Sequence, residues 1–393
     1  MSEKLYYKDV YQKEFDATVL SCENRQDGIW LLLDKTCFYP TGGGQPHDTG
    51  TLEAGGIKAN VLQVEIENDN IWHRVDKAFY ENMQVHGKID WERRFDHMQQ
   101  HAGEHMLAGC IYNLHKGVTQ GLHLGEATST IDVKMPNGKT RLSEAEILEL
   151  EMLLSRRIQE DATIRCWFPS EEELKTLPLR KPSSVKENIR VVAAGNFEMV
   201  PCGGTHPSTT GQIGLVKVLA TTPSKGFMRV NFVAGLRATK LLNGIYASAD
   251  KASSLLSCKA EEMHIAVEQL IKREEQLKWE LSEAQKEKAG LLAEILFKDA
   301  EIYGKFKIIC TETESAPLKE LASKIIKNEN TIAILKQDKN IVFARSENLP
   351  LDMAKLLRGT GAKGGGRPDF AQGMSGETFV LEEIKKSILE ELK

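Results

Sequence analysis

Four residues that can bind a metal ion occur as two pairs, and the members of each pair stand four positions apart. His101 and His105 lie in the segment H-A-G-E-H, and Cys202 and His206 lie in C-G-G-T-H. Imidazole nitrogen and thiolate sulfur suit Zn²⁺, whereas Ca²⁺ and Mg²⁺ would call for clustered carboxylates. Because the two pairs together supply the four ligands of a zinc ion, the sequence predicts a zinc site.

The two pairs require different backbone elements to bring their side chains together. The segment Asp96–Ala108 has a helical rhythm, and residues four apart on a helix lie one turn apart on the same face. The second pair follows the strand-like run Arg190–Ala194, and its Gly203-Gly204 suits a tight loop at the end of a strand. We therefore expect one pair on a helix and the other on a loop.

The elements around these pairs predict an α+β multidomain chain. Residues 1–90 contain short β-prone runs separated by Gly, Asn and Asp, and they predict a small β-barrel-like domain. Residues 91–245 alternate helical and strand-like segments, including a helix over Ser143–Asp161 with a capping box of Ser143 and Glu146. This second region is predicted to be an α+β domain that holds all four ligands.

The C-terminal third has a different composition. Residues 246–300 contain no proline, and apolar residues repeat every seven positions from Met263 to Leu291, which predicts a helical linker with a coiled-coil seam. The seam is short and imperfect, so an antiparallel hairpin, the stalk of a homodimer and a long rod all stay open. Residues 301–393 alternate helix and strand and predict a compact α/β domain.

Composition limits the compartment and the partners. The 393 residues contain no apolar run long enough to span a bilayer, and the N-terminus lacks the apolar core of a signal peptide. The seven scattered cysteines do not resemble a disulfide framework. We expect a cytoplasmic protein without a membrane partner. A net charge of −5 gives no general attraction to nucleic acid, so such a contact needs a local basic patch.

The glycine-rich segment Phe38–Pro46 has neither the spacing nor the Lys-Ser/Thr ending of a Walker loop for nucleotides. Two interpretations stay open. The segment is either a plain turn or a loop whose backbone approaches a ligand, with Thr41 and Gln45 as hydrogen-bonding side chains.

A second glycine-rich segment, residues 358–368, is basic, and no acidic residue occurs between Asp352 and Asp369. Glycines let backbone N–H groups converge on a phosphate while cations neutralise it. A phosphate-binding loop and a solvated surface loop are the two interpretations. The candidate binding residues are Lys355, Arg358, Lys363, Gly364, Gly365, Gly366 and Arg367.

The motifs of the chain occur in a fixed order: Phe38-Tyr39-Pro40 with Gly43-Gly44-Gln45-Pro46, then Asp90–Arg94, the two ligand pairs and Gly226–Val230. In this order the chain resembles the free-standing alanyl-tRNA editing proteins, the AlaX family, in their long form. It is thereby similar to the editing and C-terminal parts of alanyl-tRNA synthetase. The tail, through its helical segment and glycine-rich stretch, resembles the DHH-associated domain of that synthetase.

This resemblance implies a function. It implies a trans-editing hydrolase that uses Zn²⁺ to deacylate alanine tRNA mischarged with serine or glycine. Residues 301–393 are then expected to bind the tRNA body or to form the dimer contact. Because an alanine pocket cannot strongly reject serine, a second site must bind the serine hydroxyl. Thr41 is the first candidate for that contact and Gln45 the second.

The chain also departs from the family, which leaves alternatives open. The class II aminoacylation core of the synthetase is missing, so charging of tRNA is not expected. Glu104 stands where the segment also fits H-x-x-E-H, the inverzincin protease pattern, in which the glutamate is a general base. The first alternative is therefore a metalloprotease with Glu104 as a catalytic residue. The second is a non-catalytic tRNA-binding protein, because four filled protein ligands are typical of a structural zinc.

Overall fold

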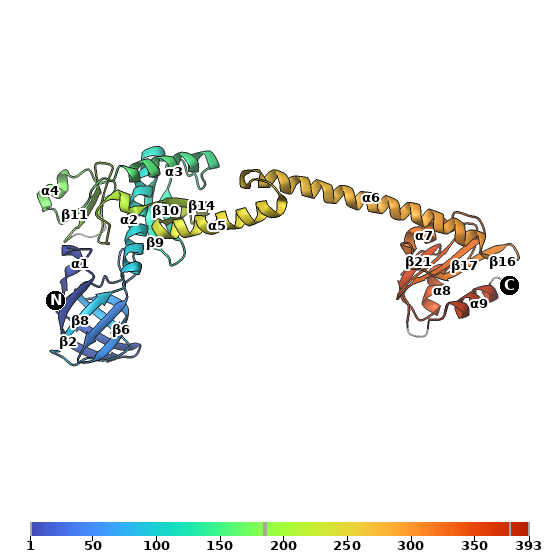
Figure 1. Ribbon diagram of the computed structural model, residues 1–393, viewed down its shortest axis with the longest axis horizontal. Coiled ribbons are helices and arrows are strands. Elements are labelled where there is room, and N and C mark those ends of the chain that lie inside the picture. The colour runs from blue at the N-terminus through green and yellow to red at the C-terminus, as the bar shows by residue number, and fades with distance from the viewer. Residues whose placement is uncertain (1, 184–186, 377–378, 392–393) are drawn as a thin grey trace. The chain divides into compact units, whose positions relative to one another are not determined.

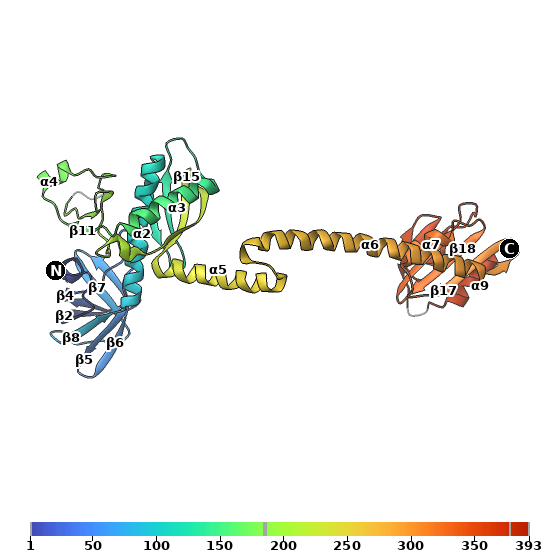
Figure 2. The ribbon, with the colours of Figure 1, turned by 45° about the horizontal axis from the view of Figure 1, so that its top comes forward.

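The structure is a computed structural model that describes residues 2–183, 187–376 and 379–391. Its contacts divide into two compact units, Met1–Ser248 (unit 1) and Ala249–Lys393 (unit 2). Figures 1 and 2 show the elements of both units in the same colours from two directions. Within the described residues, no helix is both long and apolar enough to cross a membrane.

A closed antiparallel β-barrel forms the first part of unit 1 (blue in Figure 1), and its strand order is β2-β3-β7-β6-β5-β8. Buried and exposed residues alternate strictly along β8, because neighbouring side chains of a strand point to opposite faces. The predicted small β-barrel is therefore confirmed. The elements of this part are β1 (Glu3–Lys4), α1 (Leu5–Lys8), β2 (Glu14–Arg25), β3 (Gly28–Leu33), β4 (Lys35–Thr36), β5 (Gly50–Ala54), β6 (Ile57–Glu67), β7 (Asn70–Val75) and β8 (Gln84–Ile89).

Helix α2 (Trp91–His115) follows the barrel directly and carries the first ligand pair. The Asp90 side chain caps its N-terminus by accepting a hydrogen bond from the Arg93 amide. At the other end, Lys116 adopts the left-handed conformation with φ 55° and terminates the helix. Both ends of α2 are thus set by local sequence.

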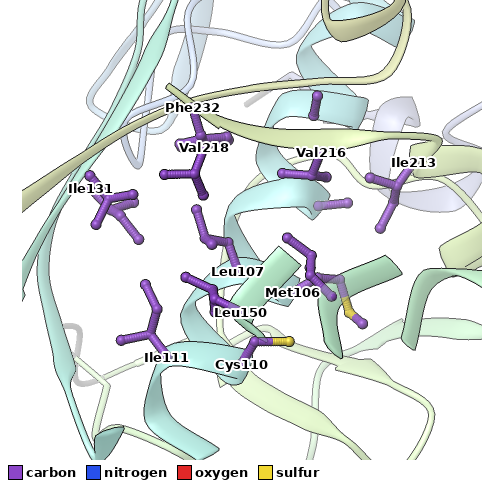
Figure 3. Packing of buried hydrophobic residues seen from close by; sticks show 14 of the residues in the cluster. Met106, Leu107, Cys110, Ile111, Ile131, Leu150, Ile213, Val216, Val218 and Phe232 are labelled. Carbon is purple, nitrogen blue, oxygen red and sulfur yellow. The ribbon is translucent and has the colours of Figure 1, made fainter. Parts of the chain in front are cut away.

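One apolar core joins α2 to a helix and to a four-stranded antiparallel sheet of order β14-β15-β10-β9. Figure 3 shows Leu107 and Ile111 of α2 near Leu150 of α3 and Phe232 of β15, and all four are 0 % exposed. Because each such side chain contributes about 1.5–3 kcal/mol when buried, this packing fixes the helix that bears the ligands. The elements are β9 (Val118–Leu124), β10 (Ser129–Lys134), α3 (Glu144–Gln159), β14 (Val216–Ser224) and β15 (Phe227–Ala234).

The predicted helix near residues 143–161 is confirmed as α3, and both hydrogen bonds of its Ser143–Glu146 capping box are present. A three-stranded sheet of order β11-β12-β13 completes the ligand-bearing part of unit 1. Its last strand leads into the second ligand pair. The elements are β11 (Ile164–Trp167), α4 (Glu171–Thr176), β12 (Val191–Ala194), β13 (Glu198–Pro201), η1 (Thr210–Ile213) and α5 (Gly235–Leu256).

The helical linker predicted over residues 246–300 is interrupted. Helix α5 ends at Leu256, Ser257 has a φ of 52°, and α6 (Met263–Lys298) begins only after the short η2 (Ala260–Glu262). Along α6 the described buried residues are Ala289 and Ala293, whereas heptad residues such as Leu277 are more than half exposed. The coiled-coil seam therefore stays a prediction.

Unit 2 contains a six-stranded sheet of order β16-β17-β18-β19-β21-β20, and among its described strands the β17–β18 pair alone is parallel. The prediction of an α/β domain is therefore corrected: the domain is α+β, and its mixed sheet is mostly antiparallel. A tight hairpin turn at Asp338 joins β18 to β19, and such a turn needs no crossover helix. The elements are β16 (Glu301–Tyr303), β17 (Phe306–Glu312), α7 (Leu318–Ile325), β18 (Thr331–Gln337), β19 (Asn340–Arg345), α8 (Met353–Gly359), β20 (Lys363–Gly366), β21 (Phe370–Met374) and α9 (Leu381–Glu391).

The second glycine-rich segment is not a loop throughout, so this expectation is wrong for residues 363–366. They form the edge strand β20, which pairs with β21. A Cβ atom at Gly364 would lie 2.3 Å from the Gln372 carbonyl oxygen, and one at Gly366 would lie 2.2 Å from that of Phe370. These glycines therefore permit two strands to approach each other closely.

Candidate metal centre

The first ligand pair lies on the buried side of α2. His101 and His105 are 2 % and 5 % exposed, and their rings meet edge to face with centroids 5.1 Å apart. A Cβ atom on Gly103, between them, would lie 2.8 Å from the Ala234 Cβ, so a glycine is needed for β15 to approach the helix. The predicted helical placement of this pair is confirmed.

The second pair lies on the loop that follows β13, as the sequence predicts. The Cys202 amide donates to the Arg190 carbonyl at 2.9 Å, directly after β13 ends at Pro201. A Cβ atom on Gly204 would lie 2.2 Å from Cε1 of His101. Because glycine has no such atom, the loop can lie against the histidine of the first pair.

The four side chains meet in one cluster. The ligand atoms of His101, His105, Cys202 and His206 all lie within 4.8 Å of one another. The Cys202 sulfur is 3.3 Å from Nε2 of His101 and 3.3 Å from Nε2 of His206. Tetrahedral bonds of about 2.0–2.3 Å would separate the donor atoms of a zinc ion by about 3.3–3.8 Å. The two sulfur–nitrogen distances therefore fit a zinc ion.

The electrostatics of the cluster also fit a cation. Loss of water around these groups lowers the pKa of His101 to about 3 and raises that of the Cys202 thiol to about 12. Neutral imidazoles are the form that binds metals, and a coordinated ion would deprotonate the thiol. The donor set therefore suits Zn²⁺.

Gln45 contacts the cluster from the barrel side. Its Oε1 accepts hydrogen bonds from Nδ1 of His101 at 2.9 Å and from the Thr205 amide at 3.0 Å, and its Nε2 donates to Oγ1 of Thr205 at 2.8 Å. The bond to Nδ1 holds the proton of His101 there and leaves Nε2 free to face the Cys202 sulfur. Gln45 is fully buried, so the geometry makes it a residue that orients a ligand.

Thr41 lies on the exposed side of the same loop. Its hydroxyl is 3.0 Å from Nδ1 of His47, and its amide donates to the Val64 carbonyl. Thr41 is not among the described residues that line the cavity beside the cluster, whereas Gly43 is. A contact between Thr41 and a serine side chain stays a prediction.

A cavity of about 1140 Å³ adjoins the cluster and is lined by residues of the barrel and of the α+β part of unit 1. His101, His105, Cys202 and Glu104 are all on its wall. The Glu104 carboxylate lies 3.7 Å from Nε2 of His105, and burial raises the pKa of this carboxyl above its ordinary value. A ligand in the cavity can therefore reach the metal donors and an acidic group at once.

A buried ion pair supports the cavity wall. The Nε of Arg180 donates to both carboxylate oxygens of Glu198 at 2.8 and 3.0 Å, and its Nη1 donates to Thr119 at 3.0 Å. The side chains of the ion pair are 5 % and 2 % exposed. Burial raises the pKa of Glu198 to about 7, while Arg180 opposes that shift. The sequence gives no signal for this pair, whose members lie 18 positions apart.

The predicted basic candidates lie in unit 2. Lys355 and Arg358 are on α8, Lys363, Gly364, Gly365 and Gly366 form β20, and Arg367 follows that strand. Arg367 makes an exposed ion pair with Asp369 at 3.2 Å. The candidates thus come from a helix and an adjoining edge strand, and their role stays a prediction.

Sequence reasoning missed two residues that hold the Cys202–His206 loop. Nη1 of Arg190 donates to the carbonyls of Cys202 and Gly204 at 3.0 and 2.8 Å. The Tyr7 hydroxyl donates to the Gly203 carbonyl at 2.8 Å, across 196 positions of sequence. Neither residue belongs to a recognisable motif, and only the fold brings Tyr7 to this loop.

Two protein families match separate parts of unit 1. The family described as tRNA synthetases class II (A) matches residues 3–93, which include the barrel. The family described as threonyl and alanyl tRNA synthetase second additional domain matches residues 189–231, which include Cys202 and His206.

Among solved structures, the C-Ala domain of Aquifex aeolicus alanyl-tRNA synthetase is 24 % identical and covers 23 % of this chain and 95 % of its own. Its TM-score of 0.21 is too low to support a conclusion.

Two curated relatives cover almost the whole chain. Alanine–tRNA ligase of Pyrococcus abyssi is 32 % identical over 403 residues, and the match spans 98 % of this chain but only 43 % of that ligase. Alanyl-tRNA editing protein AlaX-L of Pyrococcus horikoshii is 31 % identical over 391 residues, with 95 % of this chain and 94 % of the relative covered. Since the second match spans both chains nearly end to end, this protein belongs to the AlaX-L family of alanyl-tRNA editing proteins.

Proposed function

We propose that this protein is a trans-editing hydrolase that removes serine or glycine from wrongly charged alanine tRNA. The observation that supports this most is the cluster of His101, His105, Cys202 and His206, of which the first three line a cavity of about 1140 Å³. The chain's membership of an editing family makes the aminoacyl end of a tRNA the natural occupant of that cavity. A cavity of this size can hold a ligand as large as an aminoacyl nucleoside.

The proposed reaction is hydrolysis of the ester between the amino acid and the terminal ribose. Water oxygen adds to the ester carbonyl carbon, the bond from that carbon to the ribose oxygen breaks, and the ribose oxygen takes up a proton. When bound by the four donors, Zn²⁺ would polarise the carbonyl or lower the pKa of a water. Glu104 is the proposed proton acceptor for the attacking water, since it lines the cavity and its carboxylate lies 3.7 Å from Nε2 of His105.

Two residues of the first glycine-rich loop have different proposed roles. Thr41 remains the proposed contact for the serine hydroxyl, because a threonine hydroxyl can bond another hydroxyl that alanine lacks. For Gln45 we propose the orientation of His101, which its buried hydrogen bonds support. Loss of Gln45 is then expected to affect all substrates alike, whereas loss of Thr41 affects serine alone.

We further propose that unit 2 binds the tRNA body through its basic candidates and that α6 contributes to a homodimer. The cations of α8 and the adjoining Lys363 and Arg367 support the first part. The exposed apolar heptad residues of α6 support the second, since Leu270, Leu277 and Leu291 are each more than half exposed. A cytoplasmic location follows from a role in translation fidelity.

One observation favours a second candidate function. Glu104 lies beside His105, as the general base of an H-x-x-E-H protease would. That function leaves the match to the editing family unexplained, so the editing role is preferred. A tRNA-binding protein with a structural zinc is the third candidate, since four protein ligands fill a tetrahedral site.

One experiment separates the three candidates. The zinc-loaded full-length protein is incubated with seryl-, glycyl- and alanyl-tRNA of the alanine acceptor, and separately with an unstructured peptide. Release of serine or glycine with alanine retained supports editing, and peptide cleavage supports the protease. If all substrates stay intact while tRNA binds, the protein is a binding module and the proposed function is wrong.

A further inference from the structure

Three consecutive carbonyls of the metal loop are all held by the protein. The Cys202 and Gly204 carbonyls accept hydrogen bonds from Arg190, and the Gly203 carbonyl between them accepts one from Tyr7. The Arg190 guanidinium also lies 4.9 Å from the centre of the Tyr7 ring, which braces the two donors against each other. The orientation of three successive peptide groups is thereby fixed.

A fixed carbonyl also fixes the next N–H, because the peptide group is planar and trans and the two point in opposite directions. The Gly204 N–H is directed at the Cys202 sulfur, 3.4 Å away, and the Thr205 N–H donates to Gln45 at 3.0 Å. The N–H of Gly203 has no acceptor among the described residues. Of the N–H groups in these three peptide groups, it is therefore the one without an acceptor among the described residues.

The position of the Gly203 N–H indicates what it can bind. Gly203 lines the cavity, it directly follows the metal donor Cys202, and its backbone is exposed. Its N–H points away from the Arg190 nitrogen that holds the Cys202 carbonyl. A donor held in this way needs no reorganisation when negative charge develops on a nearby oxygen.

We propose that the Gly203 N–H stabilises the oxyanion of the tetrahedral intermediate and that Arg190 is the residue that positions it. This rests on the proposed ester hydrolysis. When water adds, the electron pair of the C=O double bond moves onto the carbonyl oxygen, and this oxygen accepts the hydrogen bond. As the intermediate collapses, the pair re-forms the double bond, the bond to the ribose oxygen breaks, and that oxygen takes a proton.

The test compares two non-hydrolysable ligands on the zinc-loaded full-length protein. One is adenosine that carries serine through a 3′ amide, which mimics the ground state. The other carries a phosphonate, whose tetrahedral oxygens mimic the intermediate. Arg190→Gln should weaken phosphonate binding about 10²-fold and leave amide binding within about threefold, because an oxyanion donor acts mainly on the charged species. On seryl-tRNA, kcat should fall about 10²-fold with little change in KM.

Arg165→Gln is the matched control, since Arg165 is an exposed arginine of β11 that stacks on Trp167 and does not contact the loop. Both variants are checked for zinc content and thermal unfolding. Should Arg190→Gln fail to fold or lose zinc, glycolic acid in place of Gly203 gives a second variant. It replaces the N–H by oxygen and keeps every side chain, and the same selective loss is expected.

The outcomes separate this proposal from the proposed function. Equal losses for the amide and the phosphonate, or no loss for either, contradict the oxyanion role even if the protein edits. Wild-type protein that leaves seryl-tRNA and glycyl-tRNA intact contradicts the editing function. In that case, a glycolic acid variant that loses affinity for the amide and the phosphonate equally would also contradict the proposed role of the Gly203 N–H.

Discussion

Two regions of unit 1 bury polar side chains in opposite ways. At the junction of the barrel and α2, the fully buried Arg94 of α2 donates through Nε to both oxygens of the fully buried Asp48 at 3.0 and 2.9 Å. His73 is equally buried, and its nitrogens lie 2.9 Å from the Thr36 hydroxyl and 3.2 Å from the Leu31 carbonyl. These three side chains, Arg94, Asp48 and His73, which we call the barrel polar groups, find their partners within the protein, whereas the buried Nε of Arg74 on β7 has no partner among the described residues.

The ligand cluster is different. The Cys202 sulfur lies 3.3 Å from Nε2 of both His101 and His206, and a thiol has a single proton to share between these two nitrogens. A buried polar atom without a partner costs about 1–3 kcal/mol. The comparison indicates that buried polar groups with partners stabilise the fold. Buried metal-binding groups without enough partners instead indicate a site for a bound ion.

The largest expected effect is at the cluster. Replacing Cys202 or His105 by Ala should remove zinc and lower kcat/KM for seryl-tRNA by on the order of 10³-fold or more, because a bound ion supplies several kcal/mol of transition-state stabilisation. Zinc content by mass spectrometry and single-turnover deacylation measure this. Cys22→Ala in the barrel is the control. If both variants lose zinc and keep full activity, the cluster is not needed for deacylation and this prediction is wrong.

For the barrel polar groups, the expected effect is on stability. Arg94→Met leaves the Asp48 charge buried and unpaired, so the free energy of unfolding should fall by about 3–5 kcal/mol. Arg229→Met is the matched control, since Arg229 pairs with Asp132 at a partly exposed site, and there the loss should be much smaller. Urea unfolding of the zinc-loaded protein measures both. Similar losses for the two variants would count against the buried pair.

A third prediction concerns acid sensitivity. Burial lowers the pKa of His73 to about 4 from an ordinary value of 6.5, so folding favours its neutral form. Its contribution is complete above pH 6.5 and is lost as the pH falls toward 4, a loss of about 3 kcal/mol. His73→Gln should lack this part of the pH dependence. Unfolding free energies of both proteins at several pH values give the difference, and parallel curves would contradict the assignment.

The smallest expected effect is at Thr41. Its hydroxyl contacts His47 and the residue is outside the cavity lining, so Thr41→Val should lower serine removal less than about tenfold. Zinc content should stay unchanged. Gln45→Ala should cost more, because it frees the His101 ring. If both variants hydrolyse seryl-tRNA at the wild-type rate, the loop serves only the fold.

Local spacing explains which features could be predicted. Helix α2 with its two histidines and the capped α3 were predictable, because their determinants lie within a few residues. The contacts of Arg190 and Tyr7 with the metal loop were not, since they join residues up to 196 positions apart. The glycines of β20 were assigned to a loop because glycine serves flexible turns and close strand contacts alike, and only pairing with β21 distinguishes them.

Two side chains from the N-terminal, barrel-containing part contact the Cys202–His206 loop, and these contacts limit which chimaeras of this protein can keep the site intact. Tyr7 and Gln45 come from residues matched by one family, and the loop they contact comes from residues matched by another. A chimaera that grafts the loop-bearing part onto a foreign barrel would lose one carbonyl anchor and the orientation of one ligand. The two parts must therefore be exchanged together, and compensating substitutions should pair positions 7 and 45 with the loop.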